Sequence, residues 1–297
     1  MPELSIIVPT KNEPHAPALI RRLYSTFGKN AEIIVVDKSS PGRRKELERT
    51  GARVVVQESA GYENALMEGF KLAGGSIIAT IDGDSTYYPE DLKKIIEELK
   101  KGDYGFVAGA RTIAEEGAMT PTLKLGNNFL TGFFNALYRT KMHDVLSGSF
   151  AMTKKAFESI KNEMPYRAGT IFFEIELKRR GYGITDVPIR YGTRKGTKPQ
   201  ITRAKPVYGF SMAFHAVRYA RDYNPLLIFG GAGVILIILG LIVGGLVIGN
   251  YLATGALSEV GRALMAFMLV VVGILAIIAG FILDLLLEIE RKIYNKP

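Results

Sequence analysis

The sequence predicts an α/β protein in which helices cover both faces of a mostly parallel sheet, followed by two transmembrane helices. Three observations lead to this prediction. Short apolar segments alternate with helical segments through the first 190 of 297 residues, which is typical of a parallel sheet. Acidic residues follow several of the expected strands. Beyond residue 224, two long stretches contain no charged residue.

The expected strands are short apolar runs that end in turn residues. They cover 4–8, 32–37, 52–57, 76–81, 104–110 and 184–191. The expected helices cover 18–27, a short charged segment after 42, 62–73, 89–101, 120–138, 154–160 and 172–180. Pro89 favours a helix start, because its fixed backbone angle suits the first turn. The segment 144–149 is predicted as a turn or the start of a strand.

Composition narrows the chemistry that the protein can perform. The chain has no cysteine and three histidines, which excludes disulfides, thiolate metal sites and cysteine nucleophiles and argues against a multi-histidine site. Any metal is therefore expected to be held mainly by carboxylates. The N-terminus runs directly into the first strand, so no signal peptide is expected.

The basic residues are concentrated in one segment. Residues 190–224 contain eight Lys or Arg and one Asp, which gives +7 of the net +9 of the whole chain. This basic segment directly precedes the uncharged stretches. An anionic membrane surface or a phosphate substrate explains that position better than a nucleic acid does.

The turn Asp82-Gly83-Asp84 follows the fourth expected strand. Side chains alternate along a strand, so we expect Asp82 and Asp84 to point the same way, with Gly83 allowing another group to approach the backbone. Two carboxylates suit Mg²⁺ or Mn²⁺, which in turn binds a diphosphate. An ordinary turn that caps the next helix is the alternative. Glu13 and Asp37 also follow strands, and the carboxyl ends of parallel strands share one edge, which favours a nucleotide-type site there.

The C-terminal part predicts a membrane hairpin. Stretches 226–248 and 263–283 hold 23 and 21 uncharged residues, enough to cross ~30 Å of hydrocarbon. Lys and Arg flank the pair on its outer sides, which predicts a cytoplasmic N-terminal domain and C-terminus. A buried hairpin in a soluble protein is the alternative. Glycines on the first stretch, and above all Gly230, Gly231, Gly233, Gly240, Gly244 and Gly245, favour close helix–helix contact.

The segment before the hairpin is amphipathic. Residues 207–223 place Phe210, Phe214 and Val217 on one helical face, which suits a helix in the membrane interface, although packing on the soluble domain is an alternative. The predicted organisation has three parts. Residues 1–205 form the catalytic domain, 206–224 the interfacial helix, and 225–297 the hairpin with a short basic tail.

Several motifs, taken together, carry a family resemblance. They are Pro9-Thr10-Lys11-Asn12-Glu13, Asp37 at the end of its strand, Asp82-Gly83-Asp84, Asp144-Val145-Leu146-Ser147-Gly148, Phe173-Glu174-Ile175-Glu176-Leu177 and Asn224-Pro225-Leu226-Leu227. In this order and spacing they resemble a family 2 glycosyltransferase with the GT-A fold. More narrowly, the chain looks like the archaeal dolichyl-phosphate hexosyltransferases, which are relatives of dolichol-phosphate mannose synthase. The resemblance extends from residue 5 to about residue 230.

The resemblance implies a reaction and its partners. A hexose would move from a nucleoside diphosphate sugar, a UDP- or GDP-hexose, to dolichyl or polyprenyl phosphate, with inversion and with Mg²⁺ or Mn²⁺ as cofactor. The enzyme would be a multi-pass membrane protein with its catalytic domain on the cytoplasmic face. The resemblance also allows the enzyme to form a homo-oligomer. Thr86 stands where mannose synthases often carry a glutamine ligand, which favours a UDP-hexose over GDP-mannose.

The resemblance also implies roles for individual residues. Catalytic roles fall to Asp82, Asp84, Arg111 and Asp144, with Asp84 and Asp82 as the metal ligands. The nucleotide would be bound by Pro9, Thr10, Asn12, Glu13, Asp37, Arg194, Lys195 and Lys198. The acceptor and the sugar would be bound by Arg111, Lys124, Ser147, Gly148 and Glu174.

Three other functions fit the sequence less well. A nucleotidyltransferase would need a glycine-rich phosphate loop, which residues 9–14 lack, and has no use for two membrane spans. A non-catalytic adaptor that binds acidic lipid leaves the acids at the strand ends unexplained. A processive polysaccharide synthase would carry more spans.

Overall fold

The structure is a computed structural model that describes residues 2–162, 170–194, 224–256 and 260–294. It divides into two compact units, Met1–Ala216 and Val217–Pro297, which are described separately below.

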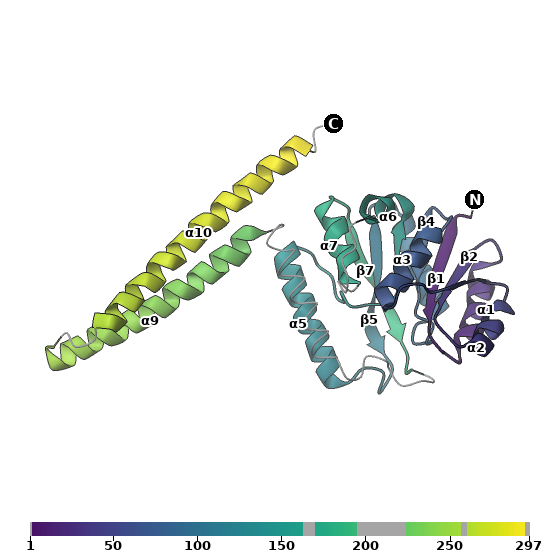
Figure 1. The fold of residues 1–297 in the computed structure, drawn as a ribbon, viewed down its shortest axis with the longest axis horizontal. Coiled ribbons are helices and arrows are strands. Elements are labelled where there is room, and N and C mark those ends of the chain that lie inside the picture. The colour runs from purple at the N-terminus through teal and green to yellow at the C-terminus, as the bar shows by residue number, and fades with distance from the viewer. Residues whose placement is uncertain (1, 163–169, 195–223, 257–259, 295–297) are drawn as a thin grey trace. The chain divides into compact units, whose positions relative to one another are not determined.

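The first unit is built around a mixed seven-stranded sheet (Figure 1). Its strands are β1 (Leu4–Thr10), β2 (Glu32–Asp37), β3 (Arg53–Val56), β4 (Ile77–Thr80), β5 (Phe106–Ala114), β6 (Phe150–Thr153) and β7 (Ile184–Tyr191). Their order across the sheet is β3-β2-β1-β4-β6-β5-β7. β6 runs antiparallel to both of its neighbours, and the other pairs are parallel. The mostly parallel α/β class is therefore confirmed.

Seven helices of this unit are described. They are α1 (Ala16–Phe27), α2 (Pro41–Glu48), α3 (Tyr62–Leu72), α4 (Pro89–Lys100), α5 (Pro121–Tyr138), α6 (Lys154–Ile160) and α7 (Ile171–Arg179). α1 and α4 bury Leu19 and Ile95 with Val8 on one face of the sheet. On the other face, Phe70 of α3 packs edge-on against Phe157 of α6 and Phe173 of α7. Helices thus cover both faces, as the alternating pattern predicts.

The strand register brings the predicted acidic segments together. β1 pairs with β2 so that Thr10 lies opposite Asp37, and β1 pairs with β4 so that Ile7 lies opposite Thr80. The chain leaves β4 alongside the end of β1, where the Gly83 N–H donates to the Pro9 carbonyl at 3.3 Å. The carboxyl edge of the sheet therefore collects residues from three separate parts of the sequence.

One detail agrees with the sequence prediction and another differs from it. Segment 144–149, predicted as a turn or the start of a strand, forms a turn held by side-chain hydrogen bonds, and β6 begins at Phe150. β4 ends at Thr80, so Asp82 and Asp84 lie in a turn and not on the strand. Strand alternation is therefore not what orients these two side chains. The predicted helix 207–223 lies outside the described residues.

The second unit is a helical hairpin. A π-helical turn, Leu226–Gly230, leads into α9 (Gly231–Thr254), and α10 (Val260–Tyr294) returns alongside it. A Cβ on Gly233 would lie 2.5 Å from the Gly273 carbonyl oxygen, and one on Gly240 would lie 2.9 Å from that of Ala266. These glycines therefore permit the close contact that the sequence predicts. Gly231 and Gly245, by contrast, have no described neighbour within 4 Å.

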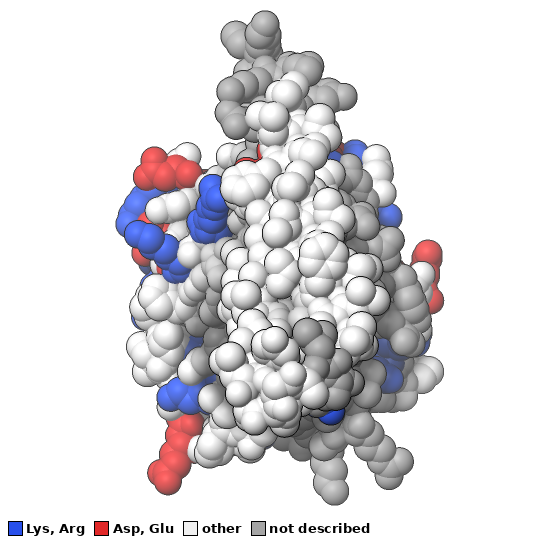
Figure 2. All heavy atoms as spheres, turned by 90° about the vertical axis from the view of Figure 1, so that its left-hand side faces the viewer, with Lys and Arg blue, Asp and Glu red and all other residues white. Residues whose placement is uncertain are grey.

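The outer surface of this hairpin is apolar. Leu226–Thr254 and Val260–Leu287 are each long and apolar enough to cross a membrane, and little of their surface is buried in the protein. In Figure 2 the hairpin face is mostly white, with few charged residues showing among the described atoms. A hairpin from a soluble core would bury these side chains, so the exposed Leu and Ile favour a lipid environment.

Asp91, in the first turn of α4, ties this helix to β7. Its buried carboxylate accepts from the Arg190 backbone N–H at 3.0 Å and from Arg190 Nε at 2.8 Å, and Lys94 Nζ lies 2.7 Å away. Burial alone would raise the pKa of Asp91, but the hydrogen bonds from Arg190 and Lys94 outweigh it and lower that pKa. The ionised carboxylate is therefore the form that stabilises the fold.

We expect Asp91→Asn to lower the free energy of unfolding by about 2 kcal/mol, because two charge-assisted contacts are lost. Because the pKa of Asp91 is lower in the folded protein, its stabilising effect is complete at pH values above the pKa of the carboxyl in the unfolded chain. The difference in stability between wild type and variant should therefore shrink as the pH falls below about 4. Urea unfolding followed by circular dichroism measures both effects. Glu97→Gln, in an exposed pair with Lys93 on the same helix, is the control and should change stability by less than about 0.5 kcal/mol.

Candidate active site

The acidic turn after β4 is held by hydrogen bonds to each carboxylate. The Tyr62 hydroxyl donates to Asp82 Oδ1 at 2.6 Å, and the Thr86 hydroxyl donates to Asp84 Oδ1 at 2.7 Å. Ser85 adopts a left-handed backbone, φ 63°, which turns the chain sharply after Asp84. The two carboxylates are thereby fixed next to one another at the sheet edge.

Two glycines allow close packing around this turn. A Cβ on Gly83 would lie 2.6 Å from Thr10 Cγ2, so only glycine fits between the turn and the end of β1. A Cβ on Gly148 would lie 2.4 Å from Asp82 Oδ2, so the backbone of Gly148 lies directly against that carboxylate. The Gly148 N–H donates to the Tyr87 hydroxyl at 2.8 Å. The structure thus brings Gly148, predicted to line the acceptor and sugar pocket, next to Asp82.

The ends of β1 and β2 form the neighbouring part of the site. The Thr10 hydroxyl donates to Asp37 Oδ1 at 2.9 Å, and Arg44 Nε donates to Asp37 Oδ2 at 3.0 Å. Asn12, at φ 55°, accepts from the Ser40 N–H at 3.0 Å, and its own N–H donates to Ser39 Oγ at 2.7 Å. Asp37 is fully buried. Its carboxylate is therefore shielded from solvent and orients the Thr10 and Arg44 side chains.

Arg194 follows β7 and reaches across to two of the predicted acids. Its Nη2 pairs with Glu13 Oε1, and its Nη1 lies 3.5 Å from Asp84 Oδ2. Lys195 and Lys198, predicted to act beside it, lie outside the described residues. A cation from the basic segment is thus in contact with the acidic turn.

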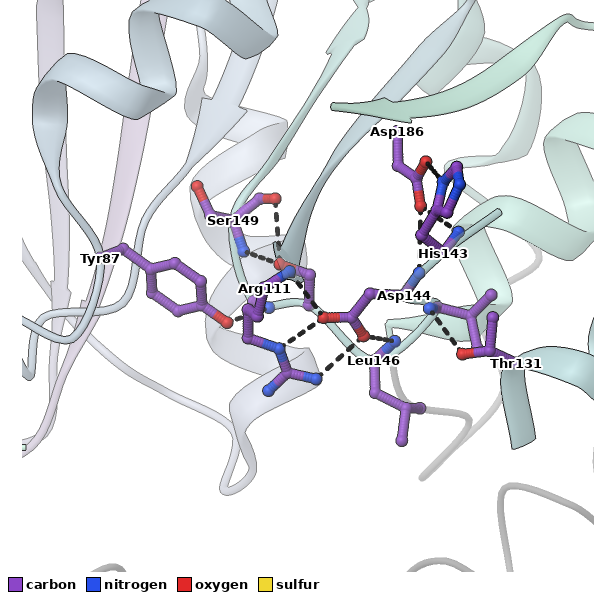
Figure 3. Close-up of polar contacts among 11 residues, drawn as sticks. Tyr87, Arg111, Thr131, His143, Asp144, Leu146, Ser149 and Asp186 are labelled. Atoms are coloured by element: carbon purple, nitrogen blue, oxygen red, sulfur yellow. Dashed lines mark hydrogen bonds and ion pairs between the residues drawn. The ribbon is translucent and has the colours of Figure 1, made fainter. Parts of the chain in front are cut away.

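A second cation, the Arg111 guanidinium, acts on Asp82 through its charge. Arg111, on β5, donates from Nε to Asp144 Oδ2 at 2.6 Å and from Nη2 to Asp144 Oδ1 at 3.0 Å, forming a two-pronged pair (Figure 3). Asp186 supports this pair from behind, since it accepts from the Asp144 N–H at 3.0 Å and contacts His143 Nδ1 at 2.8 Å. The guanidinium also lies over the ring of Tyr191, 5.3 Å from its centroid. Arg111 is therefore held rigidly.

The protonation behaviour of the site follows from its burial and charges. Burial, and then the charge of Asp84, raise the pKa of Asp82 to about 7. Burial would also raise the pKa of Asp144, but the hydrogen bonds and charge of Arg111 outweigh it and lower that pKa. Burial and the nearby charges of Asp144 and Asp186 raise the pKa of Glu174, whose Oε2 has no described hydrogen-bond partner. Asp144 is thus the anion of the second pair, while the raised pKa leaves Asp82 only partly ionised at neutral pH, even though the charges of Arg111 and Arg194 lower that pKa.

The acidic turn fits a hard divalent cation. The described residues contain no group of three or more His, Asp and Glu side chains that could hold a metal ion. The protein would then supply Asp84 and Asp82, and phosphate oxygens and water would complete the coordination. Mg²⁺ is often bound this way, through one or two carboxylates and substrate phosphates. A nearby cation would also favour the ionised form of Asp82.

The other predicted residues differ in their burial and in their contacts. Ser147 is buried in the turn before β6, where its hydroxyl donates to the Ser149 carbonyl at 3.4 Å. Lys124 is an exposed residue in the first turn of α5, and the structure does not bring it to the acidic turn by any described contact. Glu174 is buried in α7 within the electrostatic influence of Asp144.

The fold and this site can now be compared with known proteins. The model of the family "Glycosyl transferase family 2" matches residues 5–161, which is just over half of the chain and runs from the second residue of β1 past the end of α6. The chain belongs to this family. It is a glycosyltransferase.

Several relatives of this glycosyltransferase carry descriptive names. Glycosyltransferase AglJ of Haloferax volcanii is 28% identical over 291 residues, which cover 97% of this chain and 94% of that protein. A dolichyl-phosphate hexose transferase of the same organism is 28% identical over 65% of this chain and 85% of its own. The dolichol-phosphate mannosyltransferase of Pyrococcus furiosus is 28% identical over 65% of this chain, and the match spans 57% of that longer protein.

Solved structures show the same fold at lower identity. Glucosyl-3-phosphoglycerate synthase from Mycobacterium tuberculosis, crystallised with Mg²⁺ and UDP, matches 73% of this glycosyltransferase and 79% of its own chain. The TM-score is 0.59 at 18% identity. Mannosyl-3-phosphoglycerate synthase from Rubrobacter xylanophilus gives 0.57 at 17% identity. These neighbours establish the GT-A-like fold of the catalytic unit.

Some residues around the glycosyltransferase site escaped the sequence interpretation. Tyr62, Arg44 and Asp186 each hold a predicted residue in place, yet each comes from a different element. Tyr62 and Asp82 are 20 residues apart, and Asp186 and Asp144 are 42 apart. No local pattern marks such partners, because their pairing depends on the sheet order.

Proposed function

We propose that this enzyme transfers a hexose from a nucleoside diphosphate sugar, with a UDP-hexose favoured over GDP-mannose, to dolichyl phosphate or a related polyprenyl phosphate. One observation carries the proposal. At the edge where the parallel strands end, Asp84 of the acidic turn lies 3.5 Å from the Arg194 guanidinium, and the charge of Arg111 acts on Asp82. That arrangement suits two phosphate groups and a divalent cation at once.

The nucleotide would lie on the side of β1 and β2. Pro9, Thr10, Asn12, Glu13 and Asp37 are the residues proposed to form the nucleoside pocket, with Arg194 and the following Lys195 and Lys198 over the diphosphate. Asp84 and Asp82 would hold Mg²⁺ or Mn²⁺. The fold neighbour crystallised with Mn²⁺ and UDP supports a nucleotide and a cation of this kind.

The UDP preference rests on Thr86. Its hydroxyl and backbone N–H both bind Asp84 Oδ1, at 2.7 and 3.1 Å, so this side chain orients a metal ligand instead of serving as one. The position therefore lacks the amide that the resemblance associates with mannose synthases.

The acceptor phosphate would lie on the side of β5. Arg111 is held by Asp144 in a fixed orientation, and a guanidinium binds phosphate oxygens in a planar, two-pronged geometry. Ser147, Gly148, Glu174 and Lys124 complete the proposed acceptor and sugar pocket. Relatives named for dolichyl phosphate support this acceptor class. The two apolar helices would bring the enzyme to the membrane that contains such a lipid.

The chemistry needs few groups from the protein. An oxygen of the lipid phosphate forms a bond to the anomeric carbon, the bond from that carbon to the diphosphate breaks, and the nucleoside diphosphate leaves with inversion. Since the acceptor is already an anion, no proton has to be removed by a general base. Arg194 stabilises charge on the departing diphosphate, while Arg111 orients the attacking phosphate. A bound divalent cation supplies further charge neutralisation at the leaving group.

The proposed arrangement in the membrane follows the three predicted parts. Residues 1–205 form the catalytic domain, 206–224 lie in the membrane interface, and 225–297 span the bilayer twice. The basic outer flanks of the hairpin favour a cytoplasmic catalytic domain and C-terminus.

A panel of donors tests the proposal. The purified protein is supplied with dolichyl phosphate, Mn²⁺ and labelled UDP-glucose, UDP-N-acetylglucosamine or GDP-mannose, and the label in the organic phase is counted. We expect a UDP-hexose to give the highest rate, and EDTA to lower it at least about a hundredfold. Transfer from GDP-mannose alone would refute the donor preference, and full activity in EDTA would refute the metal.

A further inference from the structure

Arg194 is in contact with two carboxylates that the proposed function assigns to a ligand. Its guanidinium pairs with Glu13 and lies 3.5 Å from Asp84. Both acids are largely buried, with side chains 7% and 14% exposed, so water screens these charges only weakly. Arg194 therefore supplies the positive charge beside these two carboxylates.

The backbone just before Arg194 is clamped on two sides. The Thr193 N–H donates to Glu115 Oε2 at 3.1 Å, and the Tyr88 hydroxyl donates to the other oxygen of the same carboxylate. On the opposite side, the Gly192 N–H donates to the Thr86 carbonyl at 2.8 Å. A Cβ on Gly192 would lie 2.7 Å from the Tyr88 hydroxyl, so the segment passes very close to that ring. This clamp aims the Arg194 side chain at the acidic turn.

The guanidinium is not fully satisfied in this position. Arg194 Nε is buried and has no hydrogen-bond acceptor among the described residues. A buried donor without a partner is unfavourable, and an anionic oxygen is the group that would satisfy it best. The present pairing thus leaves one donor available for a phosphate.

We infer that Arg194 is the resident counter-ion of Asp84 and Glu13, and that a divalent cation has to displace it, whereupon Arg194 moves to the diphosphate of the donor. This inference rests on the proposed metal site. Two cations cannot both approach the Asp84 carboxylate closely without strong repulsion. The metal alone should therefore bind weakly, whereas metal and nucleotide together give Arg194 a new anionic partner. Ordered loading of the donor with its cation follows from this exchange.

Titration of the full-length protein with Mn²⁺ in the absence of nucleotide, followed by electron paramagnetic resonance of the free ion, tests the inference. We expect Arg194→Gln to bind Mn²⁺ about tenfold more tightly than wild type, because the competing cation is gone. With Mn²⁺ saturating, the same variant should bind UDP about tenfold more weakly, because a phosphate ligand is lost. Opposite changes in two affinities are not expected from a merely structural role.

Two controls separate charge from position. Arg194→Lys keeps a cation in place and should bind Mn²⁺ within about threefold of wild type. Arg53→Gln removes one positive charge near the opposite edge of the sheet, where Arg53 pairs with Glu32, and should leave Mn²⁺ affinity unchanged. Equal or weaker Mn²⁺ binding by Arg194→Gln would overturn the displacement inference alone. If neither wild type nor any variant binds Mn²⁺, or if Asp84→Asn binds it as tightly as wild type does, the proposed metal site is refuted as well.

Discussion

Asp84→Asn is expected to lower the rate of hexose transfer about a thousandfold while leaving the protein folded. Asparagine keeps the size of the side chain and the oxygen that accepts from Thr86, at 2.7 Å from its hydroxyl. It loses the negative charge that would hold the divalent cation beside the departing diphosphate. Loss of such electrostatic stabilisation commonly costs two to three orders of magnitude in rate, that is ~10²–10³.

The measurement is the initial rate of label transfer to lipid, with circular dichroism to check the fold. Asp103→Asn, an exposed acid before β5, removes the same charge away from the site and should keep the wild-type rate. Added Mn²⁺ should restore little activity to Asp84→Asn. A rate within about threefold of wild type would contradict the assignment of Asp84 to the metal.

Arg111→Lys is expected to lower transfer about a hundredfold and to raise the KM for the lipid phosphate more than the KM for the donor. Lysine keeps the charge but cannot form the two-pronged pair with Asp144, whose contacts to the guanidinium are 2.6 and 3.0 Å. Asp144→Asn should have a similar effect, since it leaves Arg111 without its orienting partner.

A double-mutant cycle tests whether this pair acts as a unit. The double variant Arg111→Lys, Asp144→Asn should be little slower than either single variant, because the same geometry is lost in each case. Thr131→Val, which removes a hydroxyl that accepts a 3.4 Å bond from the Val145 N–H near the pair, serves as a control for local packing. Additive losses, or an unchanged KM for the lipid phosphate, would contradict the role given to Arg111.

Much of the fold was predictable because parallel sheets have a strong sequence signature. Each apolar run up to β5 was followed by a helix, and the carboxyl ends of such strands share an edge. That rule alone placed Glu13, Asp37 and the acidic turn at one edge, and the register of β1 with β2 and β4 brings the ends of these strands together. The antiparallel direction of β6 was not predictable. This strand has only four residues, Phe150–Thr153, and so short a segment does not indicate which strands it pairs with or in which direction.

The site was predictable only in its outline. The acids and the basic segment stood out by their position after strands and by their charge. The side chains that hold them did not. Tyr62 for Asp82, Glu115 for Thr193 and Asp186 for Asp144 come from distant segments that meet only after the sheet forms. Even Asp82 and Asp84 are oriented by a turn with Ser85 at positive φ, and not by the strand alternation expected from the sequence.

The central claim is that a sugar alone moves onto an anionic lipid phosphate. The most direct test supplies ³²P-labelled dolichyl phosphate and a UDP-hexose labelled in the sugar, then identifies the nucleotide released and the lipid formed. We predict UDP as the released nucleotide and a lipid monophosphate that carries both labels. Release of UMP with a lipid diphosphate, or sugar transfer only to a soluble phosphorylated acceptor such as phosphoglycerate, would contradict the proposed function.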